Sequence, residues 1–225
     1  MERFETRDGR KSGHVYGSFK NVKALAMGFR PKNLVFVYDR GASWRKALLP
    51  TYKANRRAGG AADITVPLPD GQYDVYEGQP VDWTPAPDVE RLLRSFPGIH
   101  LACEDMEADD MAAWFVQNHP VDKREGAIVL YTGDRDYWQL VSNDNNVAAM
   151  MTKKTKGGPR KTTNVWIWDE HVEESFGVPP NALAKLKAFL GDESDNIRGL
   201  EGAARPGKKK ALRDFPRSNM SDVYI

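Results

Sequence analysis

Short continuous apolar runs alternate along this chain with segments whose apolar side chains recur at helical spacing. The helical spacing predicts helices over residues 14–29, 88–96, 111–117, 137–141, 172–176 and 181–190. The apolar runs are typical of buried strands and cover residues 33–38, 99–103, 127–131, 147–151 and 165–168. This alternation predicts an α/β fold with a mostly parallel central sheet flanked by helices.

Residues 58–87 depart from that alternation, because they are rich in Gly, Ala, Pro and Asp and show little helical period. Within them, Pro69-Asp70-Gly71 predicts a hairpin turn between strands at Ile64–Leu68 and Tyr73–Tyr76. We therefore expect an exposed insertion here.

Carboxylates follow three of the predicted strands directly. Asp39 follows 33–38, an acidic cluster at 104–110 follows 99–103, and Asp134 with Asp136 follows 127–131. One Asp after a strand is usually a turn residue or a helix cap. In a parallel sheet, however, the carboxyl ends of the strands share one edge, where ligands bind. Three such junctions in one chain favour a shared cation site.

Oxygen ligands of this kind suit Mg²⁺ or Mn²⁺. Carboxylates from several strand ends can hold two such ions roughly 3.5–4 Å apart, the arrangement used for phosphodiester cleavage by water. No serine, cysteine or histidine arrangement for nucleophilic catalysis stands out. Metal-assisted hydrolysis is therefore the simplest chemistry for these residues.

The charge distribution adds a second feature. The net charge is only +2, yet bases gather at residues 45–57, 153–161 and 205–213, apart from the acids. Separate acidic and basic patches fit a protein that holds cations and a polyanion together, although the basic segments are equally typical of solvated surface. The single cysteine, Cys103, lies in an apolar run and is interpreted as a core residue. One cysteine allows no internal disulfide, which suits a reducing cytoplasm, and no apolar run approaches a membrane span.

Four motifs in order resemble the flap endonuclease-like 5′-nucleases, which include the 5′-nuclease domain of bacterial DNA polymerase I and its phage relatives. The motifs are Tyr52-Lys53-Ala54-Asn55-Arg56, Glu107-Ala108-Asp109-Asp110, Thr132-Gly133-Asp134-Arg135-Asp136-Tyr137-Trp138-Gln139-Leu140 and Gly191-Asp192-Glu193-Ser194-Asp195-Asn196-Ile197. The resemblance spans about residues 14–215, and the ordered set is far more specific than any one motif.

The resemblance implies a site assembled from these motifs. The implied metal ligands, for two Mg²⁺ or Mn²⁺ ions, are Asp39, Glu107, Asp109, Asp110, Asp134, Asp136, Asp192 and Asp195. The implied catalytic cations beside the scissile phosphate are Lys53, Arg56 and Arg45. Glu104 and Asp105 fall outside the motif, and we expect them to be solvated surface acids.

The region after Asn196 resembles the family's helix–three-turn–helix, which grips duplex phosphates. The residues implied to bind DNA are Tyr52, Gly199, Gly202, Gly207, Lys208, Lys209 and Lys210. A solvated charge run near the chain end is the alternative interpretation of the lysines. We accordingly predict a catalytic core over 1–176 and a DNA-binding region over 177–225.

Two departures from the family pattern are visible. The stretch 58–87 occupies the arch position without resembling arch helices, so threading of a 5′ strand is not predicted from it. The family also opens with a buried strand carrying an Asp ligand, and nothing before His14 matches that strand. We expect Met1 to follow it.

The leading functional hypothesis is a metal-dependent 5′-3′ exonuclease and flap endonuclease that acts in DNA replication or repair. Its expected partners are DNA 5′ ends, flaps or junctions and possibly a replication polymerase, and it would act as a monomer in the cytoplasm of a bacterial or phage-infected cell. One alternative is a catalytically impaired DNA-junction binder, which would bind DNA without metal-dependent product. A PIN-like ribonuclease is the other alternative, and the Gly191–Ile197 motif argues against it.

Overall fold

The structure is a computed structural model that describes residues 4–5, 9, 12–41, 43–53, 64–67, 73–76, 86–122, 124–154, 162–192 and 194–199. The chain divides into two compact units. Unit 1 comprises Met1–Ala42 and Arg56–Ala108, and unit 2 comprises Ser43–Asn55 and Asp109–Ile225.

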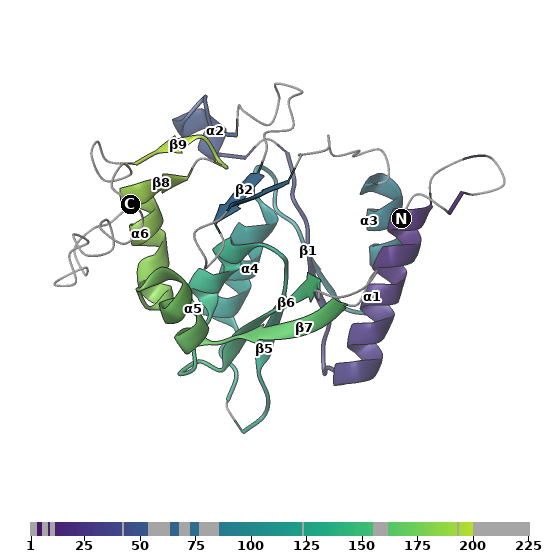
Figure 1. Ribbon diagram of the computed structural model, residues 1–225. Helices are drawn as coiled ribbons and strands as arrows, with labels where there is room; N and C mark the ends of the chain where they lie inside the picture. The colour runs from purple at the N-terminus through teal and green to yellow at the C-terminus, as the bar shows by residue number, and fades with distance from the viewer. Residues whose placement is uncertain are drawn as a thin grey trace. The chain divides into compact units, whose positions relative to one another are not determined.

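Unit 1 is built around a parallel strand pair. Strand β1 (Val35–Val37) pairs with β4 (Ile99–Leu101), with Val35 opposite Ile99. Helices α1 (Gly13–Phe29) and α3 (Ala86–Arg94) run side by side (Figure 1). The predicted hairpin is confirmed, because β2 (Ile64–Pro67) pairs antiparallel with β3 (Tyr73–Tyr76). Of the residues 58–87 expected to be exposed, Ala86 and Pro87 are exposed at the start of α3, and the other side chains of this range lie outside the described ones.

Aromatic rings connect the helices and strands of unit 1. Successive ring centroids lie 4.9–6.4 Å apart along the series Phe19, Phe96, Phe36, His100 and Tyr38. Val22 and Tyr38 are the buried hydrophobic side chains in the described part of this unit. The expectation of full burial was wrong for β1, since its residues are half-buried beside a single described partner strand.

Cys103 corrects a second expectation. Strand β4 ends at Leu101, two residues before the cysteine, and the chain then turns at 104–105. Cys103 is therefore exposed rather than part of the core.

Unit 2 contains a three-stranded sheet. Strand β5 (Ile128–Tyr131) is parallel to β6 (Val147–Lys154), and β7 (Thr162–Ile167) is antiparallel to β6. The helices around this sheet are α2 (Arg45–Leu48), α4 (Ala108–Asn118), the 3₁₀ helix η2 (Arg135–Leu140), α5 (Asp169–Phe176), the 3₁₀ helix η3 (Pro180–Ala182) and α6 (Leu183–Leu190). The predicted parallel pairing thus holds for β1 with β4 and for β5 with β6, with β7 as an antiparallel addition.

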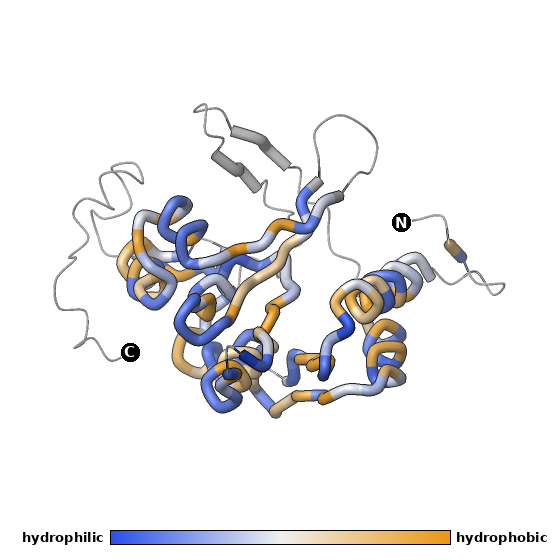
Figure 2. The backbone as a smooth tube through the Cα atoms, turned by 90° about the horizontal axis from the view of Figure 1, so that it is seen from below, coloured by the Kyte–Doolittle hydropathy of each residue, from blue (hydrophilic) through white to orange (hydrophobic). Residues whose placement is uncertain are grey.

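The core of unit 2 lies between its sheet and its C-terminal helices. The apolar run predicted for β6 is buried at every position from Val147 to Met150. Leu183 and Leu186 of α6 pack into the same cluster as Trp138 and Ile167. The helices are amphipathic, with orange and blue residues alternating along the tube (Figure 2). This packing fixes α6 to the sheet, and the predicted domain boundary at residue 177 stays a prediction.

No helix in the described ranges combines the length and the apolar character that a bilayer crossing requires.

Candidate functional site

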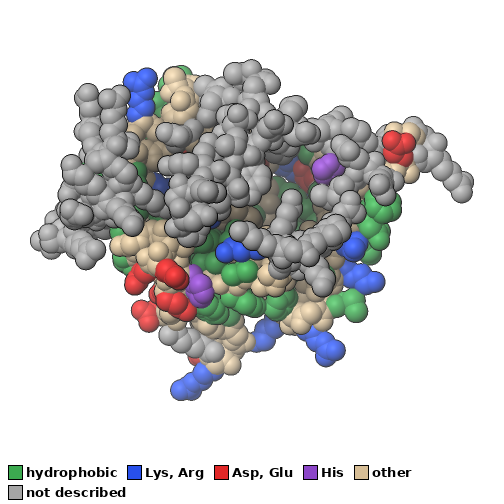
Figure 3. All heavy atoms as spheres, viewed as in Figure 1, with side chains coloured by type: hydrophobic (Ala, Val, Ile, Leu, Met, Phe, Trp, Pro, Cys, Tyr) green, Lys and Arg blue, Asp and Glu red, His purple; other side chains and the backbone are tan. Residues whose placement is uncertain are grey.

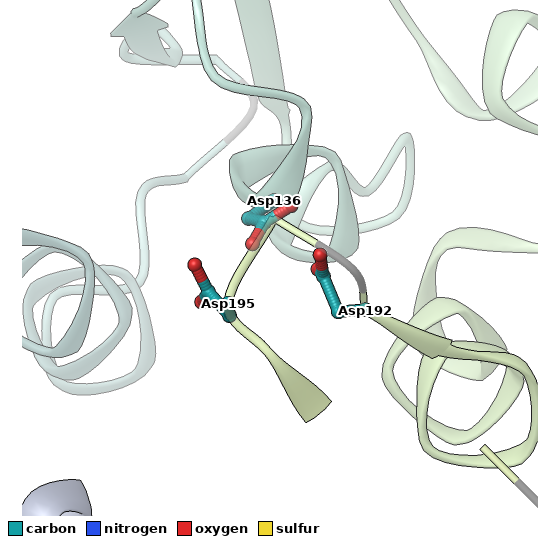
Figure 4. Close-up of side chains that lie close together, drawn as sticks. All are labelled: Asp136, Asp192 and Asp195. Carbon is teal, nitrogen blue, oxygen red and sulfur yellow. The ribbon is translucent and has the colours of Figure 1, made fainter. Parts of the chain in front are cut away.

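Three carboxylates of unit 2 gather at one point. Asp136 belongs to η2, Asp192 to the short strand β8 (Gly191–Asp192), and Asp195 to the turn before β9 (Ile197–Arg198). One oxygen from each lies within 4.8 Å of the others, and all three residues are half-buried (Figure 4). Like charges at such separations repel unless cations neutralise them.

A close approach of the backbone at Gly191 and Gly199 fixes the segment that carries Asp192 and Asp195. β8 and β9 pair antiparallel, and Gly191 has φ +81°, which favours glycine. A Cβ at Gly191 would lie 2.3 Å from the Gly199 nitrogen, and a Cβ at Gly199 would lie 2.3 Å from the Leu190 carbonyl. Both glycines therefore hold the hairpin closed against the end of α6. This gives Gly199 a packing role, and its predicted DNA contact stays a prediction.

Asp134 holds the third carboxylate in place. It is the N-cap of η2, where its side chain accepts a hydrogen bond from the Asp136 backbone N–H at 2.9 Å. Its own N–H donates to Thr132 Oγ1 at 3.0 Å. Asp134 is exposed and does not belong to the cluster of three. Its described role is to position Asp136.

The Tyr52–Lys53 segment docks onto Asp195. The Tyr52 hydroxyl donates to Asp195 Oδ2 at 3.1 Å, and the Lys53 N–H donates to the Asp195 carbonyl at 2.9 Å. Asn196 Nδ2 donates to the Thr51 carbonyl at 2.8 Å. Tyr52 is only 4% exposed, so these contacts give it a positioning role, and no DNA contact follows from them. The Lys53 ammonium lies 4.0 Å from Asp195 Oδ2.

Lys187 of α6 also contacts the cluster and is not among the residues predicted from the sequence. Its Nζ donates to Asp136 Oδ1 and, at 2.9 Å, to Asp192 Oδ2. One signal could have found it, since Lys187 lies on the helix that leads into the Gly191–Ile197 motif. A lysine on an amphipathic helix is nevertheless an ordinary surface residue, so that signal is weak.

Burial and charge shift the proton affinities of this group. Burial raises the pKa of Asp136, an effect that its hydrogen bond from Lys187 does not overcome. Burial also opposes ionisation of Asp192, but hydrogen bonds from Ser194 and Lys187 prevail and lower its pKa. For Lys187, burial lowers the pKa, yet the bonds to both carboxylates outweigh it and the pKa is raised. Lys187 is therefore a cation here, and the carboxylates keep a negative excess.

A second pair lies where α2 meets α4. Arg45 donates to both oxygens of Asp110, each at 2.8 Å, and its guanidinium also lies 4.8 Å from the Trp44 ring centroid. The hydrogen bonds to Asp110 raise the pKa of Arg45 despite partial burial. Asp109 Oδ1 accepts the Asp110 N–H at 2.8 Å. Asp109 and Asp110, two of the predicted ligands, are thus tied into the start of α4.

The remaining predicted acids belong to unit 1. Asp39 Oδ1 accepts the Ala108 N–H at 2.7 Å, and Glu107 is half-buried. Glu104 and Asp105 are exposed, as expected, and their oxygens lie 2.6 and 2.7 Å from where a Gly41 Cβ would be. The structure describes the two units separately, so a single site shared by Asp39, Glu107 and the unit 2 acids stays a prediction. Arg56, Gly202, Gly207, Lys208, Lys209 and Lys210 lie outside the described residues.

The donor set in unit 2 suits a hard divalent cation. Asp136, Asp192 and Asp195 offer only oxygen atoms, which Mg²⁺ and Mn²⁺ prefer, and their negative excess would be relieved by such an ion.

Elsewhere, Figure 3 shows acidic side chains beside a histidine over α5, whose acids are Asp169, Glu170, Glu173 and Glu174. That acidic surface is unfavourable for a polyanion, in contrast to the Lys53 side of the cluster.

Comparison with known proteins places this geometry in context. Residues 1–177 match a family model described as "5′-3′ exonuclease, N-terminal resolvase-like domain". The DNA polymerase I of Caldicellulosiruptor bescii is 30% identical over 213 residues, which are 93% of this chain and 22% of that protein. The 5′-3′ exonuclease of Mycobacterium tuberculosis is 30% identical over 234 residues, which are 97% of this chain and 65% of that protein. The chain thus spans less than two thirds of these relatives.

Solved structures agree in fold. The T5 5′-exonuclease with bound zinc is 23% identical and has a TM-score of 0.60, with 88% of this chain and 65% of that chain covered. The catalytic core of Rad2 in complex with a DNA substrate is 20% identical, with a TM-score of 0.50 and coverage of 93% and 54%. At these identities the likeness concerns the fold alone.

Proposed function

Because this chain belongs to the 5′-3′ exonuclease family, with its N-terminal resolvase-like domain, we propose that it hydrolyses DNA phosphodiester bonds near free 5′ ends, flaps or junctions. The observation that carries the proposal is the group of Asp136, Asp192 and Asp195, whose oxygens lie within 4.8 Å of one another. Replication or repair, with a polymerase as partner, is the setting we propose.

We propose that these three carboxylates hold a divalent cation, Mg²⁺ or Mn²⁺. Such an ion would supply a water of lowered pKa and would stabilise charge that develops on the phosphate. For a second ion, the sequence motifs support ligands drawn from Asp39, Glu107, Asp109, Asp110 and Asp134.

The basic side chains have a separate role in this proposal. The Lys53 ammonium is 4.0 Å from Asp195, so it lies beside the place where a phosphate would approach a cation held by these carboxylates. Its backbone N–H bond to Asp195 fixes the residue beside the cluster, and we assign its ammonium the role of binding and orienting a phosphate oxygen. We assign related roles to Arg45, held in place by Asp110, and to Arg56 from its motif.

DNA gripping is the third component. We propose that Gly199, Gly202, Gly207 and the lysines 208–210 contact duplex phosphates, as a helix–three-turn–helix does. Contacts of that kind carry no base preference and weaken as salt increases. Affinity that is insensitive to salt would contradict this part of the proposal.

The test is cleavage of a 5′-labelled flap duplex with Mg²⁺, with EDTA and without added metal. Parent protein should give product only with metal. Asp136→Asn should lose at least about a hundredfold in single-turnover rate, because it removes a cation ligand. Glu174→Gln is the matched control, since it also neutralises a carboxylate but on the exposed face of α5.

Other outcomes would redirect the proposal. Product in EDTA would contradict metal dependence. Tight flap binding in Ca²⁺ with no product in Mg²⁺ would favour a junction binder, and preferential cleavage of an RNA flap would favour a ribonuclease. Asp136→Asn that binds DNA as parent protein does would show that its loss of cleavage is not misfolding.

A further inference from the structure

Lys187 occupies the position at which a cation would contact Asp136 and Asp192. Its Nζ donates to one oxygen of each, with the Asp192 bond at 2.9 Å. These are two of the three carboxylates that form the cluster in Figure 4. A divalent ion that bound the same two oxygens would compete with the Lys187 ammonium for the space and the negative charge around them.

The attachment of Lys187 lets its ammonium move while its backbone stays fixed. Leu183 and Leu186 are each 1% exposed and anchor α6 in the core of unit 2. The Lys187 side chain itself is 32% exposed, and it reaches the carboxylates through a flexible four-carbon stem. The helix therefore keeps Lys187 within reach of the cluster, and the ammonium can turn toward solvent without disturbing the core.

Electrostatic repulsion opposes simultaneous occupancy of these oxygens by Lys187 and a divalent ion. In the absence of another cation, the ammonium relieves repulsion between carboxylates that lie within 4.8 Å of each other. A divalent ion at the same oxygens would replace that relief with a larger charge and would repel the ammonium. Each cation stabilises the site alone and destabilises it beside the other.

We infer that Lys187 is a built-in counter-ion, which neutralises Asp136 and Asp192 while no divalent cation is bound and is displaced when one binds. The divalent cation in this inference rests on the proposed function, whereas the ion pairs of Lys187 with Asp136 and Asp192 are present in the structure. It makes Lys187 a positioning residue that sets the cation concentration at which the site fills, and it explains how the carboxylates stay together without the ion.

The first test is a calorimetric titration with Mn²⁺ on parent protein, Lys187→Met and Lys185→Met. Lys187→Met keeps the stem and removes the charge, so Mn²⁺ should bind about tenfold more tightly once its competitor is gone. Lys185→Met removes a charge from the same helix and should leave the affinity within about twofold of parent. Unchanged or weaker Mn²⁺ binding by Lys187→Met would overturn the inference.

The second test uses thermal melting with EDTA and with saturating Mn²⁺. Lys187→Met should melt below parent in EDTA, and the gap should close or reverse with Mn²⁺. A deficit that persists unchanged in Mn²⁺ would mean that Lys187 is simply structural. Lys187→Gln gives a second uncharged variant if Lys187→Met fails to fold, and circular dichroism establishes folding in each case.

These measurements separate the inference from the proposed function. If parent protein cleaves DNA with metal but Lys187→Met binds Mn²⁺ as parent does, the counter-ion inference fails alone. If neither parent nor any variant binds Mn²⁺ and parent gives no product, the proposed function fails. If Lys187→Met and parent also have the same melting temperature in EDTA, the counter-ion role of Lys187 is rejected as well.

Discussion

Arg45 holds Asp110 through two parallel hydrogen bonds of 2.8 Å, which join α2 to the first turn of α4. The two residues are 65 positions apart, so this pair connects the Ser43–Asn55 segment of unit 2 to the rest of that unit. Such bidentate pairs are directional as well as strong.

The first prediction concerns this pair. With side chains 28% and 15% exposed, Arg45 and Asp110 leave a partly buried charge when either is neutralised. Arg45→Met and Asp110→Asn should each lower the free energy of unfolding by about 1–3 kcal/mol. A double-mutant cycle from urea unfolding should give a coupling energy of at least about 1 kcal/mol, and strict additivity would show that the pair contributes nothing.

The core of unit 2 gives a second prediction. Leu186→Ala should lower the free energy of unfolding by about 2–4 kcal/mol, because the Leu186 side chain is 1% exposed and packs in the central cluster. Leu48→Ala is the control, since Leu48 is 75% exposed and its truncation should stay within about 0.5 kcal/mol of parent. Equal costs in urea unfolding would mean that α6 does not pack as described.

Glu90 provides a pH-dependent prediction. Hydrogen bonds from Arg40 and Arg94 lower its pKa from 4.5 to about 2. Because the folded pKa is depressed, the stabilisation is complete above pH 4.5 and is lost as the pH falls through about 2. Glu90→Gln should therefore have a lower melting temperature than parent at pH 6. This difference in melting temperature should shrink as the pH falls from 4.5 to about 2.

The size of that effect should be modest, at most about 1 kcal/mol, since the ion pairs of Glu90 lie at the surface. Glu125→Gln, at an exposed position, is the control variant and should have a melting temperature close to that of parent at pH 6. A difference in melting temperature between Glu90→Gln and parent that grows toward pH 2 would contradict the lowered pKa of Glu90.

Cys103 offers a chemical check on the fold. Being exposed, it should react with a disulfide reagent in the native protein within about tenfold of its rate in urea. Since it is the single cysteine, the stoichiometry is one per chain, and Cys103→Ser should not react. Reaction confined to the unfolded protein would restore the core interpretation that the structure rejects.

Local pattern was enough to predict much of the fold. The run at Val147–Met150 is apolar at each position and proved buried, and Pro69-Asp70-Gly71 marked a hairpin whose strands do pair. The prediction of burial for β1 was wrong because burial depends on neighbouring strands, which the local sequence does not reveal. The run at 33–38 resembles a buried strand, but the burial of β1 depends on how many strands flank it.

The site shows the same limit. The resemblance implied eight metal ligands, and among the described residues the structure brings together the oxygens of three of them, Asp136, Asp192 and Asp195. Lys187 escaped prediction because nothing in its helix distinguishes a lysine that faces solvent from one that folds back on two carboxylates. The packing of α6 decides between them, and that packing is a tertiary property.

The contact between Tyr52 and Asp195 has a consequence for biosynthesis. The two residues are 143 positions apart, and a ribosome that adds about 5–20 residues per second needs roughly 7–30 s to cover that interval. Through that period the emerging chain carries the basic motif without the last acidic one. The group of Asp136, Asp192 and Asp195 can assemble only after Asp195 has been synthesised, so a chain that terminates before Asp195 would lack the proposed cation site.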